Sequence, residues 1–283
     1  MENAVLFDNN GYSLHAELRR NARQVVVFFP NKSETGAATE RAAETAFGAR
    51  FGLNIVTVRS DNADWFLGAA FDECLEALEH MCGWFTHVTF VGTGMGAYGA
   101  IKAATRIAAD HVIAMSPVAA LDPDALPADN RFAKDFKQLG ELDAVTDHKA
   151  QAYSVLYDSA DCEHRHVQIL NLPDARTAYY KASGTAQRIQ RCLLETGLLD
   201  RVLLRLIARR RVADLMGQFR RAKRDTPGYL LTMFSANLWR RPDVSSHMLD
   251  EMRRLQILPN RHQRMQTRLN RVLERRAGQK QAA

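Results

Sequence analysis

The sequence contains no apolar run near the 18 residues that a transmembrane helix needs, so we expect no membrane span. Residues 1–4 have neither the basic start nor the apolar core of a secretory signal peptide. Only four cysteines occur, and none of them forms a C-x-x-C pair. We therefore expect reduced thiols in a cytoplasmic protein. An apolar content of 46% over 283 residues is enough for a sizeable core, in one large or two small domains.

A convincing set of metal ligands is also missing. One group of carboxylates and histidines stands out, and it comprises Asp158, Asp161, Glu163, His164 and His166. The two histidines would share one face of a strand predicted to end at residue 170, but no third ligand at suitable spacing is evident. Because zinc sites need three or four ligands, we interpret this segment as a polar loop entering a strand, and we expect no metal and no cofactor.

Charge is distributed unevenly along the chain. Residues 198–283 contain 20 Lys+Arg and 7 Asp+Glu, a net charge of +13, whereas residues 1–197 contain 18 and 25, a net charge of −7. The two parts sum to the +6 of the whole chain. This asymmetry predicts a domain boundary near Leu198, with a basic all-α region following it.

The most informative stretch is His87–Ile101, which reads as a buried strand, a glycine-dense turn and the start of a helix. Two kinds of site use such a turn. Gly92, Gly94 and Ala97 satisfy the dinucleotide fingerprint G-x-G-x-x-G/A. Gly92 and Gly96 also frame the nucleophile elbow G-x-S-x-G, with Gly94 at the nucleophile position.

The surroundings favour the elbow. A dinucleotide site expects a carboxylate at the end of the next strand, but the strand at 111–115 is followed by Ser116-Pro117. The fingerprint also belongs on the first strand of its domain, whereas strand-like runs at 24–29 and 54–58 precede this turn. Nucleotide binding through the glycine-rich turn remains an alternative.

The chain resembles α/β-hydrolase-like proteins of bacterial surface-polysaccharide loci, which often stand beside or are fused to glycosyltransferases. Their elbow, GSSMGGYAA, is similar to residues 92–100, GTGMGAYGA. Their RDxNRSWY segment is similar to 59–66, and their strand ending in Ser-Pro to 112–117. The resemblance covers roughly residues 20–200. It implies an α/β-hydrolase-like, mostly parallel sheet with helices on both faces in residues 1–197.

The departures from this pattern concern the catalytic residues. Gly94 stands in the slot of the serine. The family's histidine lies about nine residues before a Gly-Leu-Leu, which here places the slot near Gln187. No histidine lies between His166 and His247. Only the acid would persist, as Asp161 or Asp158.

These departures indicate a catalytically degenerate hydrolase-like protein. The resemblance implies a role in surface-polysaccharide assembly or modification, by binding a glycan or a glycosyltransferase-type partner. An active esterase or deacylase with an atypical site is the alternative from another class.

A candidate pocket surrounds the elbow. In hydrolases the loop at Asn31 would supply the second half of the oxyanion hole. Arg59, Asp61 and Trp65 follow a strand end, where a guanidinium and an indole suit a sugar or a phosphate. Met95 and Tyr98, in the first turn of the elbow helix, complete this set.

Other elements are predicted from hydrophobic periodicity and turn signals. They are a hairpin over 4–18, a helix over 39–51, a helix over 65–84, a short helix or cap anchored by Phe132, Phe136 and Leu139, strands at 153–157 and 166–170, and about four basic helices over 198–276.

The basic helices have an apolar face, so we expect Leu203, Leu206, Ile207 and Leu215 to be buried against the α/β domain. The residues expected in solvent, as a stripe that attracts an anionic surface, are Arg209, Arg210, Arg211, Arg220, Arg221, Lys223 and Arg224. Aromatic residues are sparse among them and no reader motif occurs, so we expect no sequence-specific binding to nucleic acid.

Overall fold

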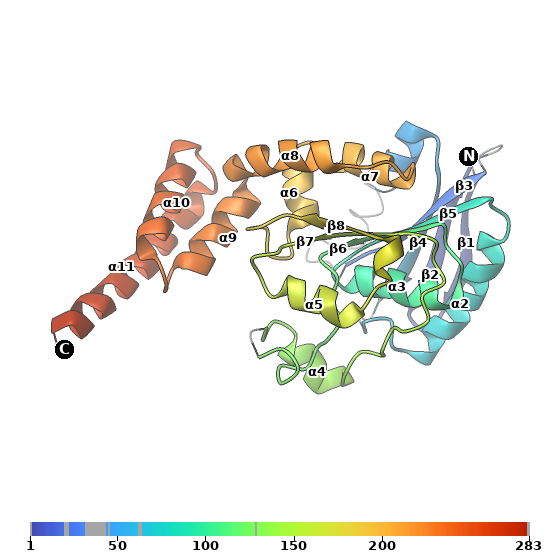
Figure 1. The fold of residues 1–283 in the computed structure, drawn as a ribbon, viewed down its shortest axis with the longest axis horizontal. Helices are drawn as coiled ribbons and strands as arrows, with labels where there is room; N and C mark the ends of the chain where they lie inside the picture. The colour runs from blue at the N-terminus through green and yellow to red at the C-terminus, as the bar shows by residue number, and fades with distance from the viewer. Residues whose placement is uncertain are drawn as a thin grey trace.

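The computed structural model describes residues 2–19, 23–31, 44, 46–61, 64–127 and 129–281. Its centre is an eight-stranded sheet with the order β1-β2-β4-β3-β5-β6-β7-β8 (Figure 1). β1 and β2 are antiparallel, and all pairs from β4 to β8 are parallel. The strands are β1 (Glu2–Asn9), β2 (Tyr12–Leu18), β3 (Gln24–Phe29), β4 (Asn54–Ser60), β5 (His87–Thr93), β6 (His111–Met115), β7 (Tyr153–Tyr157) and β8 (Thr177–Lys181).

The predicted hairpin at the start of the chain is confirmed. β1 and β2 meet at Asn10-Gly11, where both residues have positive φ values of 49° and 82°. Asparagine and glycine tolerate this conformation better than other residues, so the turn closes without steric conflict. Leu14 faces the core, and the register of β2 against β4 continues the sheet.

Helices cover both faces of the sheet, as the resemblance implies. They are α2 (Ala69–Cys82), α3 (Met95–Arg106), α4 (Ala133–Leu139), α5 (Glu163–Leu170), α6 (Ile189–Glu195), α7 (Leu199–Ile207), α8 (Ala213–Ala222), α9 (Pro227–Asn237), α10 (Pro242–Arg254) and α11 (Pro259–Gln281). One core cluster joins the sheet to α2, α3 and α5, and α4 packs against it through Phe132 and Phe136. A second cluster joins the opposite face to α6, α7 and α8 (Figure 1).

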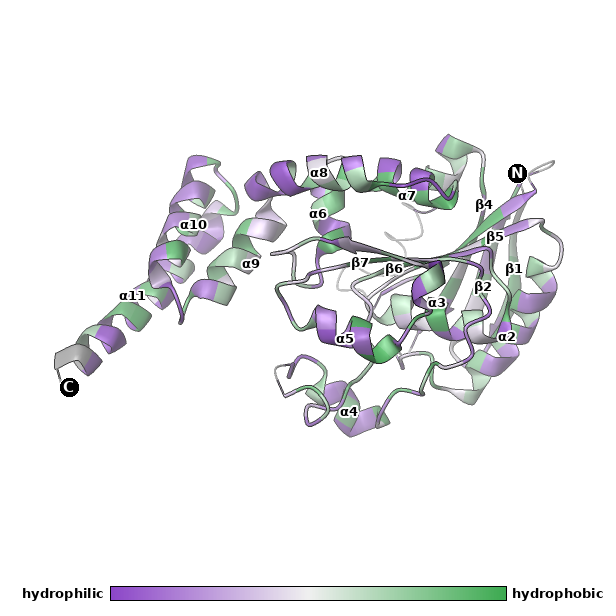
Figure 2. Ribbon diagram, viewed as in Figure 1, coloured by the Kyte–Doolittle hydropathy of each residue, from purple (hydrophilic) through white to green (hydrophobic). Residues whose placement is uncertain are grey.

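The C-terminal helices form a separate layer. α9, α10 and α11 share a cluster of their own around Phe234, Met252 and Leu269, and they extend away from the sheet (Figure 1). Hydrophilic and hydrophobic residues mix along α10 and α11, as expected of helices with one buried face (Figure 2). The start of α9 is attached to α6, because the Gly228 N–H donates to Glu195 Oε2 over 2.9 Å. None of the helices that the structure describes is both long enough and apolar enough to cross a bilayer.

Two predictions about local structure were wrong. Residues 166–170 are not a strand but the second half of α5, and the buried positions Glu163, His166, Val167 and Leu170 have helical spacing. The strand missed by the prediction is β8, which lies at the sheet edge and is only partly buried. Most of the helix predicted over 39–51 lies outside the described residues; its last part, 46–51, is helical.

Candidate functional site at the elbow

Gly94 forms the turn between β5 and α3. Its φ of 57° and ψ of −117° lie in a region that side chains rarely adopt, and its N–H donates to Met115 O over 2.9 Å. A nucleophile elbow holds its serine in such a strained strand-to-helix turn. Glycine adopts this conformation without the strain that a side chain would impose.

The flanking glycines are required by close packing. A Cβ on Gly92 would overlap the backbone of Gly96, and a Cβ on Gly96 would overlap the carbonyl of Phe29 on β3. The glycine pattern therefore has a packing explanation within the elbow, and it needs no bound phosphate to account for it.

Asn31 contacts the vacant nucleophile slot. Its Oδ1 accepts a hydrogen bond from the Met95 N–H over 3.1 Å. In serine hydrolases, the N–H after the nucleophile is one of the oxyanion-hole donors. A Cβ built on Gly94 would lie 2.5 Å from the same Oδ1. The carboxamide thus uses the donor that would stabilise an oxyanion and crowds the place where a serine side chain would begin.

The loop after β7 contains the acid position. Asp158 is buried, and its carboxylate accepts three backbone N–H groups: Ala160 over 2.8 Å, Thr185 over 2.6 Å and Ala186 over 2.8 Å. Two of these donors belong to the loop after β8, where the resemblance places the histidine slot near Gln187. Asp158 therefore joins the two loops through main-chain contacts.

Glu163 strengthens the same junction. Its carboxylate accepts from the N–H of Asp158 over 2.7 Å and from the N–H of Gln187, and burial raises its pKa to about 7. Gln187 itself has a positive φ of 54°, and its Nε2 has no partner within the described residues. The sequence prediction placed Glu163 in a polar loop, and only the helical periodicity of 163–170 could have indicated that it points inward.

The other acid candidate, Asp161, lies elsewhere. Its Oδ2 pairs with Arg131 over 3.0 Å. Arg131 also binds Asp129, which accepts the Nε2–H of the buried His166 over 3.0 Å. Burial alone would raise the pKa of Asp129, but hydrogen bonds from His166 and Arg131 hold this pKa well below its ordinary value. Ala119 N–H donates to His166 Nδ1 over 3.2 Å, so both ring nitrogens of His166 have partners inside the protein. The described ranges hold no group of three or more side chains arranged for a metal ion.

The aromatic residues of the predicted pocket are buried. Trp65 is 2% exposed; its Nε1–H donates to the buried Asp135 over 3.0 Å, and its ring packs edge-on against Phe132. Tyr98 is 1% exposed and donates to Asp143 O over 3.2 Å. Both rings therefore fasten the 119–150 segment to the core. Near them, Arg59 is half-buried and Asp61 is exposed at the end of β4, and Met95 is buried in the first turn of α3.

The basic stripe follows the prediction with one exception. The six arginines named above are exposed, and the four apolar residues are buried against the sheet. Lys223 is only 5% exposed, so its prediction was wrong. Its ammonium donates to Ser183 O and lies over the rings of Phe219 (5.8 Å) and Tyr229 (5.1 Å). A carbonyl and two aromatic faces compensate for the lost water.

Comparison with known proteins identifies the fold. No family model and no curated protein matches the sequence. An esterase from Pyrococcus furiosus superposes with a TM-score of 0.54 at 13% identity, over 74% of this chain and 91% of the esterase. A carboxyl esterase from Tuber melanosporum gives a TM-score of 0.49 at 14% identity, over 78% and 86%. The glycosylation-associated Gap123 complex from Streptococcus agalactiae gives a TM-score of 0.49 at 10% identity. This match covers 73% of the present protein and 46% of the Gap123 chain. The protein has an α/β-hydrolase fold, with the elbow between β5 and α3.

Proposed function

We propose that this protein is a catalytically degenerate α/β-hydrolase-fold protein that acts by binding rather than by acyl transfer. The observation that carries the proposal is the position of Asn31. Its Oδ1 accepts a hydrogen bond from the Met95 N–H, and it would lie 2.5 Å from a Cβ atom added at Gly94. A tetrahedral intermediate needs both a nucleophile and a free oxyanion donor at this place.

The hydroxyls beside the elbow and the residues at the predicted catalytic positions support the same conclusion. Nucleophilic catalysis by a hydroxyl needs an adjacent base, because a neutral hydroxyl is a weak nucleophile at pH 7. Thr93 and Ser116 are the neighbouring hydroxyls, and both are buried. Gln187 cannot take a proton, and Asp158 is already satisfied by backbone N–H groups.

The biological role that fits this fold is service in surface-polysaccharide assembly or modification. The sequence resemblance to hydrolase-like proteins of such loci supports it, and the bound species would be a glycan or a partner enzyme. The loss of strain at Gly94 is consistent with a fold retained for binding.

Hydrolysis of a nitrophenyl acetate ester by the full-length protein tests the proposal. We expect a rate indistinguishable from buffer and unchanged by Asn31→Ala, which frees the oxyanion donor but adds no nucleophile. Robust turnover that disappears after a single substitution in the elbow would overturn the proposal in favour of an active esterase.

The exposed arginines of the stripe support a further contact with an anionic surface. Because exposed charges are screened beyond about 8 Å at physiological ionic strength, such binding should weaken steeply with salt. Sedimentation with phosphatidylserine vesicles or an acidic polysaccharide across a salt series measures it. Absence of binding to both even at low salt would leave these arginines as a solvated face only.

A further inference from the structure

A pocket of about 640 Å³ lies where the edge strand β8 meets α8 and α9. Four cationic side chains line it: Lys181 on β8, Arg220 on α8, and Lys223 and Arg224 in the turn before α9. The Lys223 ammonium donates to Ser183 O, whereas Lys181, Arg220 and Arg224 form no ion pair or hydrogen bond with any residue that the structure describes. Burial lowers the pKa of Lys223; the carboxylate of Asp158 opposes this shift, and the positive charges of Arg224 and Arg220 add to it.

Such a grouping is unfavourable without a negative partner. Like charges near one another repel, and elsewhere in the described chain arginines such as Arg106 and Arg205 are paired with carboxylates. The hydroxyl groups of Ser159 and Ser183, 2.9 Å apart, stand at the same pocket. Guanidinium, ammonium and hydroxyl donors together form the set that binds phosphate oxygens.

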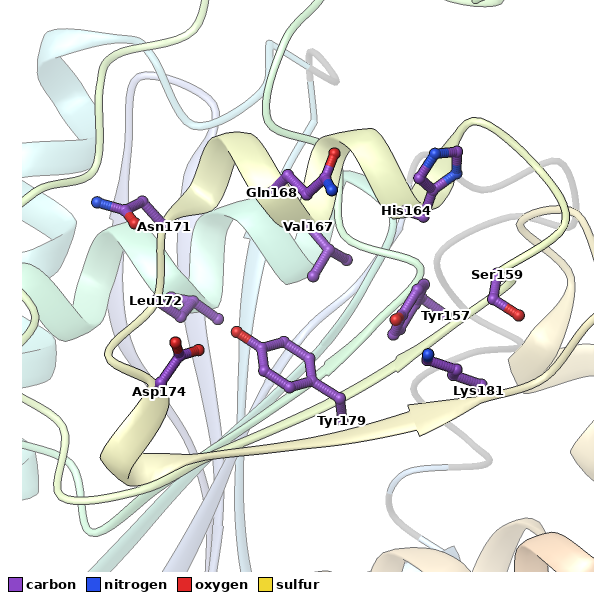
Figure 3. A pocket seen from close by; sticks show the side chains of 10 residues that line it. All are labelled: Tyr157, Ser159, His164, Val167, Gln168, Asn171, Leu172, Asp174, Tyr179 and Lys181. Atoms are coloured by element: carbon purple, nitrogen blue, oxygen red, sulfur yellow. The ribbon is translucent and has the colours of Figure 1, made fainter.

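A second pocket of about 470 Å³ adjoins the first on the α5 side of β8 (Figure 3). The two share Ser159, Tyr179 and Lys181. Figure 3 shows Lys181 and Ser159 together at one end of this pocket, with Asn171 and Asp174 at the other. The cationic pocket and the pocket with the tyrosines and amides are therefore neighbours with a common wall at Ser159, Tyr179 and Lys181.

The lining of this second pocket suits a sugar ring. The rings of Tyr157 and Tyr179 stand nearly perpendicular, with centroids 6.4 Å apart, and offer an aromatic wall. Gln168 and Asn171 on and after α5 supply amide donors and acceptors for hydroxyl groups. An aromatic wall with a few convergent polar groups is typical of small-molecule sites of this volume.

We propose that the paired pockets across β8 bind a sugar phosphate, with the phosphate held by Lys181, Arg220 and Arg224 and the sugar against Tyr179. This inference deepens the proposed binding role and rests on it, but it does not depend on how the elbow lost its nucleophile. The site lies at the end of the sheet, away from Gly94.

Calorimetric titration of the full-length protein at low salt tests the site, with glucose 1-phosphate, inorganic phosphate and glucose as probes. Glucose 1-phosphate should bind more tightly than either part alone. Arg220→Gln with Arg224→Gln should weaken its binding by about a hundredfold, because each of the two lost charge-assisted bonds contributes on the order of a tenfold change. Tyr179→Ala should weaken glucose 1-phosphate but leave inorganic phosphate unchanged.

The matched control is Arg268→Gln with Arg271→Gln on α11, which removes the same charge from exposed positions outside the pocket. It should leave the affinity unchanged. Lys181→Gln, at an exposed position of β8, provides a second pocket variant if the arginine variant folds poorly. Equal losses in the pocket and control variants, or no binding of glucose 1-phosphate, would overturn the inference. Glycan binding whose affinity is unchanged by the pocket substitutions would overturn the inference and leave the proposed function intact. Ester turnover would contradict only the proposed function.

Discussion

Introducing a serine at Gly94 should destabilise the protein. Gly94→Ser places a side chain at φ 57° and ψ −117°, a backbone strain on the order of 1–3 kcal/mol. Its Cβ would also lie 2.5 Å from Asn31 Oδ1, so the carboxamide must move and release the Met95 N–H. Losing that hydrogen bond costs about 1 kcal/mol more. We therefore expect a loss of about 2–4 kcal/mol in the free energy of unfolding.

Urea denaturation followed by circular dichroism measures this loss. The control is Gly52→Ser, because Gly52 also has a positive φ of 68° but nothing lies near its Cβ, so only the conformational cost of about 1–2 kcal/mol applies. In an Asn31→Ala background, the penalty of Gly94→Ser should shrink by about 1 kcal/mol, since the steric conflict is gone. If Gly94→Ser costs no more than Gly52→Ser and is insensitive to Asn31→Ala, the geometry assigned to the elbow is refuted.

Two further predictions concern stability and the extent of the folded unit. Burial lowers the pKa of His111 to about 4, and its ring donates through Nδ1–H to Leu206 O and accepts at Nε2 from Ser154. In the unfolded chain the pKa of this histidine is near 6.5, so between pH 6.5 and pH 4 the unfolded chain binds a proton that the folded chain does not bind. Stability should fall by up to about 3 kcal/mol as the pH drops from 6.5 to 4, and His111→Gln should lack this part of the slope in pH-dependent urea melts; an identical slope would contradict it. A fragment of residues 1–225 should be monomeric in gel filtration and folded by circular dichroism. A fragment of residues 1–197 should aggregate, because it lacks α7 and α8, which cover one face of the sheet. A well-folded 1–197 fragment would contradict this prediction and support the domain boundary near Leu198.

The sequence was most informative where local chemistry dictates the backbone. Only glycine fits the close backbone contacts at positions 92 and 96 without overlap, so the glycine spacing, together with the neighbouring strands and the family resemblance, could predict the elbow. The Asn-Gly turn at residues 10–11 is similarly local. The arginines of the stripe could be predicted as exposed because burying an unpaired charge is prohibitive.

The rest depends on contacts between distant segments. Asn31 lies 64 positions from Met95, and nothing in either neighbourhood indicates their hydrogen bond. Residues 166–170, the second half of α5, were predicted as a strand because five residues are too few to distinguish helical from alternating periodicity, and β8 was missed because an edge strand need not be apolar. Lys223 is buried only because the tertiary fold brings Tyr229 and Ser183 to it.

Labelling by a fluorophosphonate probe tests the central claim most directly. The probe reacts with a serine that is activated by a base and an oxyanion hole, and intact-mass spectrometry counts the adducts. The full-length protein should show no adduct under conditions in which an active serine esterase is fully labelled, and Gly94→Ser alone should also remain unlabelled because Gln187 provides no base. A stoichiometric adduct on the unmodified protein, mapped to Thr93, Ser116 or another hydroxyl beside the elbow, would contradict the account.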